Sequence, residues 1–169
     1  SNMGQSDVLE VFSIYGQATT SSAEASRALV QFNTAQINTD RTSGRIPASG
    51  EVSFYLKLFN VKHIETTPRN YTLAIQAVSQ SWEEGNGLDL DTREDLTYDV
   101  VGSNWIKRSG NNSWAAQGGD FHAAPVFTAT FDEGTEDLEV NVTSLVEQWI
   151  AGTKQNYGFG IFLSGSFES

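Results

Sequence analysis

Short segments in which apolar residues alternate with other residues constrain the fold of this chain most. The clearest are residues 51–61 and 70–78, where every second side chain is apolar. A period of two places successive side chains on opposite faces of an extended strand, so each segment predicts a half-buried β-strand. Further strands are predicted at residues 7–15, 27–32, 126–131, 138–142 and 157–163.

One helix is predicted near the C-terminal end of the sequence. Five apolar residues recur there at helical spacing: Val142, Leu145, Val146, Trp149 and Ile150. A helix of this length is not stable alone, so we expect its apolar face to dock on a sheet. Short strands, long polar connections and one short C-terminal helix together predict an all-β fold, an antiparallel jelly-roll β-sandwich.

The length of the chain and its lack of cysteine limit the number of domains and the ways in which the fold can be stabilised. With 169 residues it fits one domain, large enough to bury a core without covalent cross-links. We expect residues 7–169 to form that domain and residues 1–6 to be a tag remnant and disordered N-terminus, because Ser1 and Asn2 precede Met3. Without cysteine there is no disulfide and no thiolate metal site, so packing must supply the stability.

The composition argues against two classes of partner. The formal net charge is -11 and the ten basic residues are scattered, so the phosphates of a nucleic acid would be repelled. No apolar run approaches the about 20 residues that span a bilayer, so we expect no membrane insertion. The N-terminus lacks the basic and apolar regions of a signal peptide.

Residues 81–120 have no sustained helical or strand periodicity and hold three of the four tryptophans. Trp82, Trp105 and Trp114 are candidate glycan-binding residues, because an exposed indole stacks well on a sugar ring. The alternative is that these side chains fasten a long loop to the core, since each can bury about 200 Å² of surface. Both interpretations remain open from the sequence.

The same segment contains a cluster of carboxylates that predicts a candidate calcium site. Its candidate ligands are Asp89, Asp91, Glu94 and Asp95, with Asp120 if the loop folds back. Calcium prefers six to eight such oxygen ligands. The spacing lacks the glycine at the sixth position of an EF-hand loop, so that motif is absent. The alternative is a solvated acidic loop, partly neutralised by Arg93.

No catalytic residue is predicted. The two histidines, His63 and His122, have no G-x-S-x-G motif and no cysteine to act with. Glycoside hydrolysis needs two carboxylates at a fixed separation, and the spacing of the acidic residues selects no pair. We therefore expect a protein that is not an enzyme, and a polysaccharide hydrolase is the second alternative.

Several motifs carry a resemblance to a known family. They are WEEGNGLD from residue 82, DLTYD from residue 95, GSNWI from residue 102, Trp114 with GGD from residue 118, and LEVNVTSLVEQW from residue 138 followed by NYGFG from residue 156. With these motifs the chain resembles virion structural proteins of marine tailed bacteriophages. That family is similar to the wider DNRLRE group of β-sandwich domains, found on bacterial surface proteins and beside polysaccharide-active modules.

The resemblance implies a non-enzymatic jelly-roll module of a particle surface or tail, located on the virion. Its expected partners are other virion or surface proteins, and a glycan. The first alternative is a carbohydrate-binding module of a bacterial surface protein, with an extracellular or cell-surface location. The phage proteins continue past the last strand with an aromatic and basic segment, whereas this sequence stops at Ser169. We therefore expect an open edge strand through which the protein joins a partner.

Overall fold

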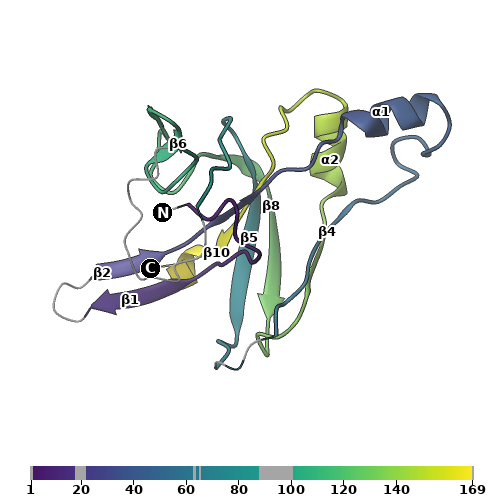
Figure 1. Ribbon diagram of the computed structural model, residues 1–169. Helices are drawn as coiled ribbons and strands as arrows, with labels where there is room; N and C mark the ends of the chain where they lie inside the picture. Colours follow the sequence, from purple (N-terminus) through teal and green to yellow (C-terminus); the bar gives the residue numbers. More distant parts are fainter. Residues whose placement is uncertain (1, 18–21, 63, 65, 88–100, 169) are drawn as a thin grey trace.

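The structure, a computed structural model, describes residues 2–17, 22–62, 64, 66–87 and 101–168. Its centre is an antiparallel sheet of four strands in the order β3, β10, β5, β8 (Figure 1). The bounds of these strands are β3 (Ala28–Val30), β5 (Tyr71–Val78), β8 (Phe121–Phe131) and β10 (Phe159–Leu163). The last strand of the chain is therefore an interior strand of this sheet and not its open edge.

Three pairs of antiparallel strands complete the β-structure of the described residues. They are β4 (Tyr55–Leu58) with β9 (Leu138–Asn141), β1 (Ser13–Gln17) with β2 (Ser22–Ala25), and β6 (Lys107–Ser109) with β7 (Asn112–Ser113). The antiparallel sheets confirm the predicted all-β class. The β1–β2 hairpin differs from the prediction, which placed a strand at residues 7–15 and a loop at residues 16–25.

Three short helices accompany the sheets in the part of the chain that the structure describes: α1 (Ala35–Thr42), α2 (Thr143–Ile150) and α3 (Gly165–Glu168). Helix α2 is the predicted helix, and it buries Leu145, Val146 and Trp149 as its apolar spacing requires. Helix α1 lies in a stretch where the sequence predicts no regular element. It buries none of its residues, which explains why it leaves no apolar periodicity in the sequence.

The hydrophobic core lies between one face of the four-stranded sheet and the β4–β9 pair with α2. Side chains at alternate positions of β5 and β10 point into it, and Ile75 lies opposite Ile161 in register. Leu145 of α2 is fully buried against them, and the ring of Trp149 meets that of Phe159 edge-on at 4.8 Å. The strand alternation and the helical spacing thus bury one common set of apolar side chains.

The opposite face of the sheet is covered near the start of β8. The ring of Phe121 lies against that of Phe162, tilted by 40° with the ring centroids 5.0 Å apart, and it lies directly over Gly160. A Cβ on Gly160 would lie 2.1 Å from the Phe121 ring, so only glycine allows this approach. The glycine in β10 therefore marks a close contact within the sheet.

A polar side chain near the N-terminus is buried. Asn2 is buried, and its side-chain amide donates hydrogen bonds to the backbone oxygens of Glu84 (2.6 Å) and Ser103 (2.8 Å). Its Oδ1 accepts hydrogen bonds from the backbone N–H groups of Gly4 and Gly87. These polar contacts tie residue 2 to the rest of the fold, and they leave no apolar pattern in the sequence from which burial could be inferred.

Candidate functional site

Trp114 lies inside the molecule. The side chain is 7% exposed, and its Nε1–H donates to the backbone oxygen of Asn104 at 2.9 Å. Its own backbone N–H donates to the oxygen of Ile106 at 3.0 Å, which holds the residue against the β6–β7 hairpin. Both the ring and the indole N–H are therefore engaged within the protein, which favours the interpretation in which Trp114 fastens the loop.

Trp82 is partly buried and joins the segment after β5 to the segment before β10. Its Nε1–H donates to the backbone oxygen of Tyr157 at 2.8 Å. The next residue, Glu83, donates its backbone N–H to Arg108 and accepts the N–H of Ser103 at its backbone oxygen. These bonds fasten the tryptophan-rich segment to the sheet and to the β6–β7 hairpin.

Trp105 is the most exposed of the three, at 37%. The guanidinium carbon of Arg27 lies 4.9 Å from the centroid of its ring and 4.9 Å from that of Phe162. The same guanidinium donates two hydrogen bonds to the carboxylate of Glu168 (2.7 and 2.6 Å) and one to the backbone oxygen of Gly118 (2.9 Å). One arginine thus joins β3, helix α3 and the tryptophan-containing loop.

Asp120 shapes a turn. Its carboxylate accepts the backbone N–H groups of Ala115 and Ala116, both at 2.8 Å, and the side-chain amide of Gln80 at 2.7 Å. These three hydrogen bonds fix the orientation of the carboxylate and hold the turn in place. The other four candidate calcium ligands, Asp89, Asp91, Glu94 and Asp95, lie outside the described residues. Within the described part of the chain, no group of three His, Asp or Glu side chains could hold a metal.

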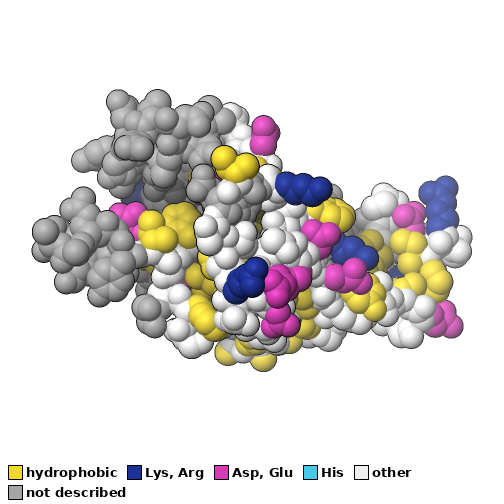
Figure 2. Space-filling model, turned by 90° about the horizontal axis from the view of Figure 1, so that it is seen from below, with side chains coloured by type: hydrophobic (Ala, Val, Ile, Leu, Met, Phe, Trp, Pro, Cys, Tyr) yellow, Lys and Arg dark blue, Asp and Glu magenta, His cyan; other side chains and the backbone are white. Residues whose placement is uncertain are grey.

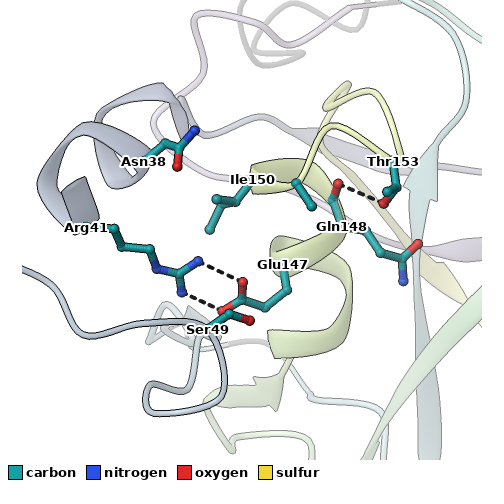
Figure 3. Close-up of a pocket in the computed structure, with 8 residues that line it drawn as sticks. Asn38, Arg41, Ser49, Glu147, Gln148, Ile150 and Thr153 are labelled. Atoms are coloured by element: carbon teal, nitrogen blue, oxygen red, sulfur yellow. Dashed lines mark hydrogen bonds and ion pairs between the residues drawn. The ribbon is translucent and has the colours of Figure 1, made fainter.

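An open hollow of about 520 Å³ lies between α1 and α2 (Figure 3). Arg41 of α1 faces Glu147 of α2 there and donates two hydrogen bonds to its carboxylate, at 2.8 and 2.5 Å. These bonds hold the pKa of Glu147 below its ordinary value of 4.5, against the partial burial that would raise it. The charged groups that border the hollow, Arg41 and Glu147, are therefore hydrogen-bonded to each other.

Two described titratable groups in or just after β8 have lowered pKa values. Partial burial lowers the pKa of His122, and the charge of Lys154 lowers it further. His63 lies outside the described residues. Hydrogen bonds from backbone N–H groups, that of Glu133 first, lower the pKa of Glu136. A general acid of a glycosidase needs a raised carboxyl pKa, which is the opposite of the shifts at Glu136 and Glu147.

An exposed apolar segment begins in β4 and continues past its end, and it was not among the sites predicted from the sequence. Tyr55, Val61 and Phe59 are exposed, the last at 79%, and Ile64 is 99% exposed. On the face seen from below, hydrophobic side chains reach the surface between acidic and basic ones (Figure 2). The signal in the sequence was that apolar residues occupy both faces of the strand predicted at 51–61, where a half-buried strand needs only one.

No helix within the described residues is long and apolar enough to span a membrane. In comparisons with protein-family models, curated proteins and solved structures, the chain gives no match in any of the three.

Proposed function

We propose that this protein is a non-enzymatic structural and interaction module, a jelly-roll β-sandwich carried on the surface or tail of a virion. The observation that supports a contact function over glycan binding is that two of the three candidate tryptophans use their indole N–H groups for hydrogen bonds within the protein. Trp82 and Trp114 both donate their indole N–H groups to backbone oxygens of the protein itself. The assignment to a virion rests on the motif resemblance, and its partners are other virion or surface proteins.

The exposed surface also favours a contact function. Phe59 and Ile64, which follow β4 in the chain, present large apolar side chains to solvent. Exposed apolar groups of this kind are typical of protein–protein contact sites. A small-molecule site instead encloses its ligand, whereas the hollow between α1 and α2 is open and contains an ion pair.

A carbohydrate-binding module is the second candidate, and the exposed ring of Trp105 favours it. Ile106 and Val101 are also exposed close to it in the chain. A sugar would stack on the part of the indole that Arg27 leaves free.

A glycan array with and without calcium separates the two candidates. We expect no binding in either condition, because two of the three indoles are engaged within the protein. Glycan binding that disappears in Trp105→Ala but persists in Phe59→Ser would replace the contact function with carbohydrate binding. For the virion, immunogold labelling of purified particles that encode the chain should decorate a fixed position, and unlabelled particles would contradict the proposal.

A further inference from the structure

The open edge of β4 is defined by the direction of its backbone groups. The backbone oxygen of Phe54 accepts the N–H of Val142, and the N–H of Asn60 donates to the carboxylate of Asp137. Even-numbered residues therefore direct their backbone groups toward the β9 side. In an antiparallel strand, the intervening odd-numbered residues direct theirs to the other side. Within the described residues, Tyr55, Lys57 and Phe59 have no backbone hydrogen-bond partner on that side.

The side chains along this edge alternate in burial. Leu56 is buried in the core and Leu58 is partly buried, whereas Tyr55, Lys57 and Phe59 are exposed. Natural proteins usually protect an open edge by charge, proline, a bulge or a covering segment. Here the one charged residue of β4, Lys57, is paired with Glu139 of the neighbouring β9 at 2.8 Å. The edge thus combines unpaired backbone groups with exposed aromatic side chains.

We propose that this edge pairs antiparallel with the same edge of a second copy, about a two-fold axis at Leu58. In that register Lys57 lies opposite Phe59 of the second copy, and Tyr55 lies opposite its Val61. Because odd-numbered residues meet odd-numbered residues, the N–H and C=O groups that point away from β9 become hydrogen-bonded to each other. The inference rests on the proposed contact function and names its partner.

Charge and packing favour this register over one with the axis at Lys57. An axis at Lys57 would place two lysines directly opposite each other, which is destabilising. An axis at Leu58 instead places Lys57 over an aromatic ring and Tyr55 against a β-branched side chain, which are both favourable cross-strand pairs. It also brings the two Leu58 side chains together on the core side, where each is only partly buried in a single copy.

The pairing would complete the smaller sheet. Two strands, β4 and β9, face the four-stranded sheet in one copy, and the dimer would join them to two more in a continuous four-stranded sheet. The paired edge from residue 55 to residue 61 would be about 23 Å long at the rise of an extended strand. A contact of this size belongs to the small, reversible class of interfaces. Each copy carries a formal net charge of -11, so added salt should strengthen the association.

Disulfide trapping tests the register, and the cysteine-free chain makes it clean. We expect a mixture of Tyr55→Cys and Val61→Cys proteins to form a cross-linked dimer faster than either variant alone. Directly opposed residues of a strand pair have Cα atoms about 5.5 Å apart, within disulfide range. Tyr55→Cys mixed with Thr128→Cys, an exposed strand residue of β8, is the matched control and should cross-link slowly.

Sedimentation equilibrium over a concentration series tests the dimer itself. The N–H of Lys57 points away from β9, so Lys57→Pro should remove the dimer while leaving the β4–β9 hydrogen bonds intact. Lys57→Ala controls for the lost charge and should still dimerise. If circular dichroism shows that the proline lowers the folded fraction, Phe59→Ser takes its place as the variant that tests the edge.

A wild-type chain that stays monomeric at every concentration, with the Tyr55→Cys and Val61→Cys mixture cross-linking no faster than its control, would overturn the inference. That result would leave the contact function in place with an unlike partner. The failure of the contact function itself would appear separately, as Trp105-dependent binding on the glycan array.

Discussion

At the scale of single residues, Arg27 joins parts of the chain that are distant in sequence. We expect Arg27→Ala to lower the free energy of unfolding by about 2 to 4 kcal/mol, because it leaves the mostly buried carboxylate of Glu168 without the guanidinium that pairs with it. Arg27→Lys should recover only a small part, since lysine cannot donate a bidentate pair to Glu168. Urea denaturation measures the loss. Arg45→Ala is the control, because its side chain is 77% exposed, and an equal loss there would contradict this role.

The Arg41–Glu147 pair should make stability depend on pH in acid. The pKa of Glu147 is lower in the folded protein than its ordinary value of 4.5. Its contribution is therefore fully present above about pH 4.5 and is lost as the pH falls through the folded pKa. We expect Glu147→Gln to be less stable than wild type at neutral pH, with a difference that shrinks in acid. Denaturant titrations across this range measure it, and a difference that stays constant with pH would contradict the prediction.

At the scale of elements, α2 contributes three buried side chains to the core. Leu145 is fully buried at the centre of its apolar face. We expect Leu145→Ala to lower the free energy of unfolding by about 3 kcal/mol, because it leaves a cavity that the packed sheet cannot fill. Ser144→Ala, on the exposed side of the same helix, is the matched control and should change stability little. Guanidinium denaturation measures both, and similar values for the two variants would mean that α2 is not docked.

The elements that could be predicted are those whose buried side chains repeat with the period of a strand or a helix. Residues 70–78 and 142–150 alternate or repeat as the structure requires, and they correspond to β5 and α2. Helix α1 could not be predicted, because it buries none of its residues, and the ion pair of Arg41 with Glu147 that joins it to α2 has no sequence period.

The candidate site was predictable only as a choice between two roles. The sequence shows that Trp82 and Trp114 have large apolar rings with one polar N–H group each. It does not show which atoms accept those hydrogen bonds, and in the structure they are the backbone oxygens of Tyr157 and Asn104. Those partners are set by the fold. For Asp120 the same holds, because its three donors meet only once the turn at residues 115–120 has formed.

At the scale of the whole molecule, the stability should be graded from the central sheet outward. Strands β5 and β10 lie inside the four-stranded sheet and contribute fully buried residues to the core, whereas the β6–β7 hairpin has three and two residues and buries none of them. We expect amide hydrogens of β5 and β10 to exchange only by global unfolding, and those of β6 and β7 by local opening at far lower free energy. Hydrogen exchange followed by mass spectrometry in increasing denaturant measures this gradient. If the amide hydrogens of the hairpin were as strongly protected from exchange as those of β5, the prediction would be contradicted, and the tryptophan-containing loop and the core would unfold as one unit. In that case the hydrogen bonds of Trp82 and Trp114 would couple the loop to the sheet as strongly as the core packing does.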